Sequence, residues 1–354
     1  MPLRSWLSPL RLAFSLVWAI AACAAPLEGQ ASEPLAVRVE NFLVTPAHGP
    51  LIRVWVLNQG AESYEGQLAL GVPAGWQIAP REQPVKLAAG EARRVVFNVQ
   101  RGVSLEGNTY PLEAKLTVGG QVVKHAQHVQ AATSPYFKPV IDGKPEDWND
   151  AVPVRFTTAG KRTEIRSYWN RNFFALLVAV EEEKLERYGA GAVCDALQVA
   201  IAAEGTQTGD SPGGVATRWE YLLVSAREHG TGRCFQLAEP GTPLSETQTR
   251  RPLDALQYNA EIAVWRNEGT TYYECAIPWR PIRETIPASE GRELCFSLLV
   301  HDPEGTGLRD WGQAVGLGPA QRNRLAWSDW PGACWPHQAP FDNKIEWGFC
   351  ASKY

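Results

Sequence analysis

The sequence has no surplus of positive charge. Its 34 Lys and Arg residues against 38 Asp and Glu give a formal net charge of -4 and a pI near 6.0. A polyanion needs a basic surface, and this balance does not supply one. Nucleic acid is therefore excluded as an expected partner.

Signatures of common enzymes are also missing. The chain contains no HExxH, Walker or GxGxxG motif, so metalloprotease and nucleotide-binding chemistry have no support. Glycoside hydrolysis is the remaining enzyme alternative. It needs two carboxylates about 5 to 9.5 Å apart in a cleft, and the sequence nominates no such pair. We therefore expect a protein that is not an enzyme.

None of the seven cysteines belongs to a CxxC motif, which argues against zinc and redox sites. After Cys23, six cysteines remain, and all lie in the C-terminal part of the chain. An even number in an exported protein favours disulfides, with buried free thiols as the alternative. The six are Cys194, Cys234, Cys275, Cys295, Cys334 and Cys350.

The first 25 residues have the pattern of an export signal. Arg4 and Arg11 flank a charged region, and Leu12 to Ala22 form an apolar stretch too short to span a bilayer. Ala22-Cys23-Ala24 fits a signal peptidase site, whereas Ile20 to Cys23 resembles a bacterial lipoprotein box that would place a lipid on Cys23. The chain is expected in the periplasm, on the outer surface or in the medium of a bacterium. A membrane is a partner only through that lipid anchor.

Helical periodicity is almost absent. Glu181 to Arg187 is the one helix candidate, and its charge favours a solvated loop. Short alternating strands separated by Gly and Pro predict an all-β protein of two tandem β-sandwiches. The first, immunoglobulin-like, covers residues 35–130. A linker spans 131–138, and the second sandwich covers 139–354.

Turn residues of the first sandwich resemble a known module. Asn58-x-Gly60, Val72-Pro73-x-Gly75-Trp76 and Gly90-Glu91 are similar to the immunoglobulin-like domain associated with bacterial α-galactosidases, the NPCBM-associated domain. This resemblance implies a spacer or accessory module without chemistry of its own.

The second sandwich is organised around residues 272–311. Tyr272 to Ile277 and Leu294 to Val300 have the composition of strands, and we expect them to form a hairpin. Asp302-Pro303-Glu304-Gly305 ends the second strand, so residues 301–310 form a polar loop at one rim. Cys275 and Cys295 lie on the two arms of this hairpin and are candidates for a disulfide across it.

Motifs of the second sandwich resemble carbohydrate-binding module family 9. In chain order they are Ile141-Asp142-Gly143 with Trp148, Trp169-Asn170, Asp195-Ala196-Leu197-Gln198, Tyr273-Glu274-x-Ala276-Ile277-x-Trp279, and Val300-x-Asp302 with Arg309. The likeness covers most of residues 140–349. It implies a β-sandwich that grips sugar ends between two tryptophans, accompanies secreted glycan-degrading enzymes and binds structural calcium.

The resemblance places one platform tryptophan at Trp335, in the irregular segment 319–342 that also holds Trp327 and Trp330. The partner tryptophan is replaced by Ala192, so Tyr188, Trp327 or Trp330 would have to supply the second wall. Gln198 occupies the position of an acidic residue in the family pattern, and Leu222 and Val224 occupy the positions of its Arg and Asn. Asp302 and Arg309 match the family pattern, either as ligand contacts or as an ion pair that fixes the loop.

Two further assignments follow from the resemblance. Cys194 and Cys334 both precede residues of the implied pocket, which makes them a candidate disulfide. Asp302, Glu304 and Asp310 are candidate oxygen ligands for calcium, with an ordinary polar turn as the alternative.

The predicted function is thus an exported, non-catalytic carbohydrate-binding protein, whose partner is a sugar or cell-wall glycan. One alternative is a structural or adhesion module of the cell surface that has lost sugar binding. Another is an accessory protein of a glycoside hydrolase system. Haem-binding sandwiches often use a methionine ligand, and the single methionine here, Met1, is removed with the signal.

Overall fold

The computed structural model describes residues 34–189, 193–206, 215–243, 252–311 and 345–352. Within these residues the regular structure consists of β-strands and three short 3-10 helices, which confirms the predicted all-β class. No helix among them has the length and hydropathy that crossing a bilayer requires. The predicted signal and Cys23 lie outside the described residues.

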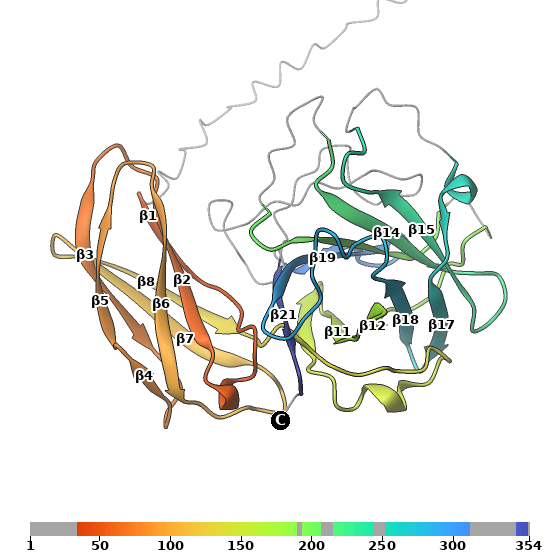
Figure 1. Ribbon diagram of the computed structural model, residues 1–354, viewed down its shortest axis with the longest axis horizontal. Coiled ribbons are helices and arrows are strands. Elements are labelled where there is room, and N and C mark those ends of the chain that lie inside the picture. Colours follow the sequence, from red (N-terminus) through yellow and green to blue (C-terminus); the bar gives the residue numbers. More distant parts are fainter. Residues whose placement is uncertain (1–33, 190–192, 207–214, 244–251, 312–344, 353–354) are drawn as a thin grey trace, which may run out of the picture. The chain divides into compact units, whose positions relative to one another are not determined.

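The first sandwich is built from two four-stranded antiparallel sheets (Figure 1). One sheet has the order β1 (Leu35–Val39), β2 (Leu51–Asn58), β6 (Ala92–Arg101) and β4 (Gln77–Ala79), and η1 (Pro46–His48) precedes β2. The other has the order β5 (Glu82–Leu87), β3 (Tyr64–Gly71), β7 (Tyr110–Val118) and β8 (Gln121–Val129). Alternate residues point inward, so that Ile52, Val54 and Val56 of β2 are fully buried.

The second sandwich pairs a five-stranded sheet with an eight-stranded one. The smaller sheet has the order β10 (Val154–Thr158), β11 (Lys161–Trp169), β12 (Phe173–Glu181), β18 (Thr270–Pro278) and β17 (Glu261–Asn267). The larger has the order β16 (Gln257–Tyr258), β15 (Gly232–Ala238), β14 (Arg218–Ser225), β13 (Ala196–Ala203), β19 (Glu293–Asp302), β21 (Ile345–Cys350) and β9 (Thr133–Pro135), with β20 (Gly307–Asp310) also paired to β19. The 3-10 helices η2 (Pro145–Trp148) and η3 (Leu253–Leu256) lie in its connections.

The predicted hairpin of β18 and β19 is wrong. The two strands belong to different sheets: β18 lies between β12 and β17, whereas β19 lies beside β13. Between them the chain buries Trp279, Ile282 and Ile286 in the core, which carries it from one sheet to the other. Aromatic and β-branched composition identified both strands but could not identify their partners.

The outer face of the five-stranded sheet is partly covered by the segment that begins with Ile141-Asp142-Gly143. Glu274 of β18 accepts two hydrogen bonds there, from the Trp148 indole Nε1 at 2.8 Å and from the Gly143 backbone N–H at 2.7 Å. The Trp148 ring is fully buried and stacks on Tyr168. One carboxylate therefore joins two of the motifs that the sequence shows far apart.

Candidate functional site

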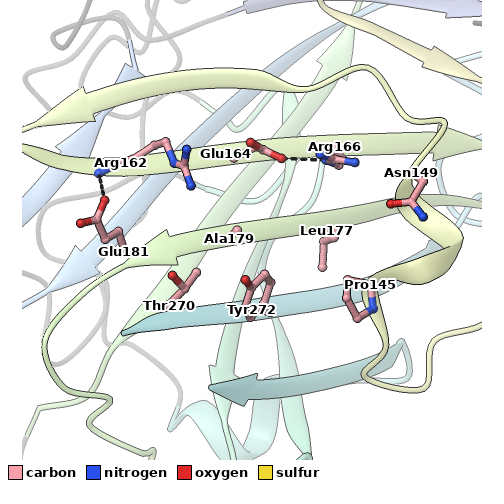
Figure 2. Close-up of a pocket in the computed structure, with 10 residues that line it drawn as sticks. All are labelled: Pro145, Asn149, Arg162, Glu164, Arg166, Leu177, Ala179, Glu181, Thr270 and Tyr272. Carbon is pink, nitrogen blue, oxygen red and sulfur yellow. Dashed lines mark hydrogen bonds and ion pairs between the residues drawn. The ribbon is translucent and has the colours of Figure 1, made fainter. Parts of the chain in front are cut away.

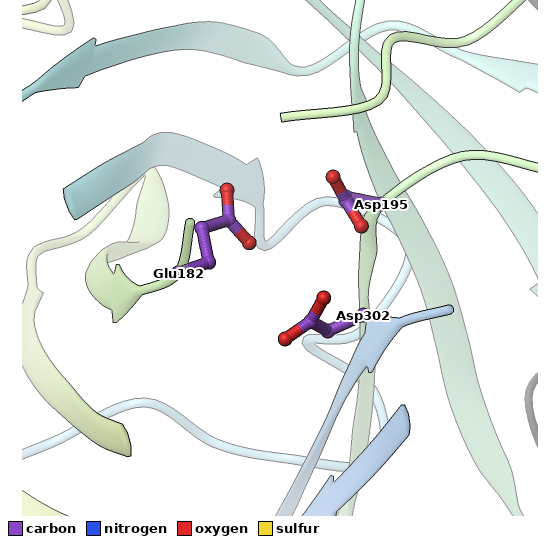
Figure 3. Close-up of side chains that lie close together, drawn as sticks. All are labelled: Glu182, Asp195 and Asp302. Carbon is purple, nitrogen blue, oxygen red and sulfur yellow. The ribbon is translucent and has the colours of Figure 1, made fainter. Parts of the chain in front are cut away.

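Three carboxylates converge at one rim of the second sandwich. Glu182 directly follows β12 of the smaller sheet, Asp195 precedes β13 of the larger sheet, and Asp302 ends β19. One oxygen from each lies within 4.8 Å of the others. Figure 3 shows the three groups pointing toward one another from separate strands. This cluster thus joins the ends of the two sheets.

Glu182 and Asp195 are buried carboxyl groups whose ionised forms are destabilised by burial and by the neighbouring negative charges. Glu182 is 3% exposed, and its Oε1 accepts a hydrogen bond from the Thr271 hydroxyl. Its Oε2 has no hydrogen-bond partner among the residues that the structure describes. Burial and then the charge of Asp195 raise the pKa of Glu182 to about 8. Burial also raises the pKa of Asp195 to about 7, although the Glu186 backbone N–H donates to it. Each group therefore resists ionisation at neutral pH.

Asp302 is held differently, by the loop that follows it. Its Oδ2 accepts hydrogen bonds from the Thr306 backbone N–H and hydroxyl, both at 2.9 Å, and from Arg309 Nη2 at 2.7 Å. Burial opposes ionisation, but these bonds outweigh it and lower the pKa of Asp302. Gly305 is required here, because a Cβ would lie 2.3 Å from Asp302 Oδ1. Arg309 is fully buried, so this ion pair fixes the loop from inside.

The three carboxylates suit a hard cation such as calcium, which prefers several oxygen ligands in one place. The Glu182 Oε2 atom without a partner is the independent indication, because a buried carboxylate oxygen is rarely left unsatisfied. Of the three sequence candidates, Asp302 belongs to this cluster. Glu304 instead forms an ion pair with Lys184 at 2.9 Å, and Asp310 is not part of the cluster.

Sequence reasoning missed Glu182 and Asp195. Glu182 lies in the charged run that was expected to be a solvated loop, and its burial shows that this expectation is wrong at that residue. Asp195 begins the motif that ends in Gln198, and the family resemblance assigns a role only to the last residue of that motif. An acidic residue next to a predicted strand end was the available signal in both cases.

Gln198 belongs to a second polar cluster, on the outer face of β13, β14 and β19. Its amide Nε2 donates to Glu220 Oε1, and His301 Nε2 lies 2.9 Å from its Oε1. Arg218 Nε in turn donates to Glu220 Oε2 at 2.9 Å. Burial lowers the pKa of His301 to about 3, so its ring is neutral. These four side chains are all 1% exposed or less, which leaves Gln198 enclosed within the network.

Leu222 and Val224 share that outer face with Gln198, since Leu222 is its direct cross-strand neighbour on β14. They pack with Phe235 in a small apolar cluster that Leu253 and Leu256 of η3 cover. Tyr188 joins the same cluster, with its ring centroid 5.3 Å from that of Phe235. Hydrophobic contacts thus occupy the positions where the family pattern would place Arg and Asn. Ala192 lies outside the described residues.

The tryptophan-rich segment leaves and re-enters the sheet beside β19. Strand β20 pairs with residues 299–302 of β19, and β21 pairs with residues 293–296. Both are antiparallel to β19 and lie one after the other along the same side of it, and β21 also pairs with β9 on its other side. The predicted platform residues Trp327, Trp330 and Trp335 fall between Asp310 and Ile345, outside the described residues.

The predicted disulfide between Cys275 and Cys295 is wrong. Cys275 points into the core between the sheets, whereas Cys295 lies on the outer face of β19 and its Sγ donates to the Ala203 carbonyl at 3.0 Å. No disulfide joins the cysteines among the described residues. Cys194 is a buried thiol there, and Cys334 falls outside them, so a bridge between these two stays a prediction.

No protein-family model matches the chain, and no curated protein does. Among solved structures, it is similar to a carbohydrate binding module family 9 from Caldicellulosiruptor kristjanssonii in complex with glucose. The two chains are 13% identical, the match covers 48% of this chain and 77% of the other, and the TM-score is 0.31. A score this low supports no inference about what this chain binds.

Proposed function

We propose that this protein is an exported, non-catalytic carbohydrate-binding protein. Its support comes from the order of the motifs in residues 140–349 and from the strands that carry them. The Gly143, Trp148 and Glu274 motif positions meet in one hydrogen-bonded unit, and the Asp195 and Asp302 carboxylates lie close together in the cluster with Glu182. Motifs that lie far apart in the chain thus act together in the fold.

The observation that carries the proposal is the placement of Asp310 and Ile345. Because β20 and β21 follow one another along β19, these two residues lie beside the same strand, and the tryptophan-containing sequence between them connects the two. Indole rings provide the flat apolar surface on which the C–H face of a sugar stacks. We assign sugar contact to Trp335, with Trp327 or Trp330 as the opposing wall.

Gln198, Asp302 and Arg309 receive a supporting role in this proposal. Each is 4% exposed or less and is hydrogen-bonded to neighbouring side chains. Gln198 stabilises the outer face of the larger sheet, and the Asp302–Arg309 ion pair fixes the rim loop that precedes β20. A cell-surface module that has lost sugar binding is the alternative, because the Leu222 and Val224 positions are filled by apolar packing.

A calcium ion at Glu182, Asp195 and Asp302 is part of the same proposal. The ion would neutralise carboxylates that otherwise repel one another and would tie the end of β12 to the ends of β13 and β19. Its role would be structural, since all three side chains are buried away from the surface.

Substituting Trp335 by Ala should weaken sugar binding by about 10- to 100-fold, since losing one aromatic platform removes about 1.5–3 kcal/mol of apolar contact. The measurement is retention of the full chain on immobilised glucose, xylose, cellobiose and xylobiose, with and without calcium. Trp335→Phe should retain part of the affinity because a flat ring remains.

Phe137→Ala is the matched control, because Phe137 is an exposed aromatic residue of the same sandwich, 43% accessible. Its retention should equal that of wild type. Wild-type protein that passes every sugar column unretained would favour the surface module. Equal binding by wild type and Trp335→Ala would remove Trp335 from the site.

A further inference from the structure

A hollow of about 210 Å³ lies on the outer face of the five-stranded sheet, whereas β20 and β21 belong to the eight-stranded sheet. Its floor and walls come from β11, β12 and β18, with Pro145 and Asn149 at one end (Figure 2). The groups that line it are of the kinds that bind a sugar ring.

The hollow exists because a small residue occupies the middle of the sheet. Cross-strand pairing places Trp265, Tyr272, Ala179 and Glu164 in one row across β17, β18, β12 and β11. Ala179 has no side chain beyond Cβ, so a gap opens between Tyr272 on one side and Glu164 on the other. Its neighbours along β12, Leu177 and Glu181, complete the floor.

Tyr272 gives this gap an aromatic wall. Its ring stacks on Trp265 with centroids 5.0 Å apart and an interplanar angle of 9°. Trp265 therefore covers one face of the Tyr272 ring. The opposite face is directed toward Ala179, the cross-strand neighbour of Tyr272 on β12. The half-buried Tyr272 ring is held upright by this stack, so little ordering is needed when a ligand packs against it.

The opposite wall supplies planar hydrogen-bonding groups. Arg166 Nε donates to Glu164 Oε1 at 2.7 Å, and Arg166 Nη1 donates to the Trp148 carbonyl at 2.7 Å, which fixes both side chains. The exposed Arg162 and the half-buried Glu181 stand at the far end. The lining thus holds two guanidinium groups and two carboxylates, and Arg155, outside the lining, donates to Glu164 Oε2 at 2.5 Å. Because each charge in the lining has an opposite charge near it, the hollow favours a neutral, hydroxyl-rich ligand over an anion.

We propose that this hollow is a second carbohydrate-binding subsite, which stacks one pyranose ring on Tyr272 and bonds its hydroxyls to Glu164, Arg166 and Arg162. The residues that form it lie on the five-stranded sheet and in the segment before β10, and none of them belongs to the Trp335 site proposed above. The small volume suits a single ring of a longer neutral glycan that continues along the exposed face. The protein would then grip a glycan at two separate places.

The decisive variant is Ala179→Leu, which fills the hollow without removing any polar group or aromatic ring. Calorimetric titration of the full chain with glucose, xylose, N-acetylglucosamine, cellobiose, xylobiose and chitobiose tests it, on the Trp335→Ala background as well. Trp335→Ala protein should keep one saturable site for at least one sugar, and adding Ala179→Leu should remove it. Ala179→Ser, which keeps the space, should bind as its parent does.

Tyr272→Leu serves as a second variant, since it removes the stacking face while keeping an apolar side chain. It should weaken the same site by about tenfold or more. Absence of any saturable binding to the Trp335→Ala protein would overturn this subsite, as would full binding by the Ala179→Leu double variant. Neither result bears on binding at Trp335, which the Ala179→Leu single variant should retain.

Discussion

Calcium should raise the thermal midpoint of this protein, and the increase should grow as the pH rises from 6 to 9. At a calcium concentration about 100 times the dissociation constant, binding to the folded state contributes about 2.7 kcal/mol. For a domain of this size, this corresponds to a shift of about 5–10 °C. Differential scanning fluorimetry with added calcium or with chelator measures it.

The pH dependence follows from the carboxylates at the rim. The pKa of Glu182 is raised from 4.5 to about 8, and that of Asp195 from 3.8 to about 7, so the folded metal-free protein binds more protons than the unfolded chain. Its stability should therefore fall as the pH rises from about 4 through about 8, by an amount on the order of a few kcal/mol. Bound calcium would neutralise the two carboxylates in place of those protons. The loss of stability with rising pH should therefore disappear when calcium is present.

Glu182→Gln separates this explanation from a general salt effect. It removes one buried charge, so the metal-free variant should be more stable than wild type at pH 8, while its response to calcium should be lost. Glu304→Gln, on the neighbouring exposed loop, should respond to calcium as wild type does. A midpoint that calcium leaves unchanged in wild type, or still raises in Glu182→Gln, would contradict the site.

Glu274→Leu should destabilise the second sandwich by about 1–3 kcal/mol. The substitution leaves the buried Trp148 indole N–H without an acceptor, whereas the partly exposed Gly143 N–H can bond water instead. Glu274→Gln keeps one carbonyl acceptor and should cost less. Urea unfolding followed by tryptophan fluorescence gives the change in midpoint.

Glu261→Leu provides the matched control, because Glu261 is exposed on β17 of the same sheet. Its effect should stay within about 0.5 kcal/mol. If Glu274→Leu unfolds at the same urea concentration as this control, the hydrogen bonds to Glu274 do not hold the segment that carries Trp148.

Much of the first sandwich could be read from the sequence. Alternation in Leu51 to Leu57 and in Tyr110 to Val118 predicted β2 and β7, because each has one buried face and one solvated face. The short β4 and the Pro-containing β5 were missed. Three residues are too few to show a period, and Pro84 counts against a strand until its place at a sheet edge is known.

The second sandwich was harder because its strands are buried on both faces. All eight residues of β14 and all ten of β19 are buried, so no alternation showed which side faces the core. A disulfide between Cys275 and Cys295 requires the two strands to be neighbours in one sheet, and composition alone does not show which sheet each strand joins. The carboxylate cluster likewise depends on three strand ends that meet only after folding.

The pairing of β20 and β21 with one strand, β19, has a consequence for protein engineering. Asp310 and Ile345 pair with Leu299 and Phe296, three residues apart along β19, which corresponds to about 10 Å of strand. The entropy cost of closing a connection between two such fixed endpoints grows only slowly with its length. We therefore expect insertions and deletions between Asp310 and Ile345 to leave the pairing of β19 with β20 and β21 unchanged.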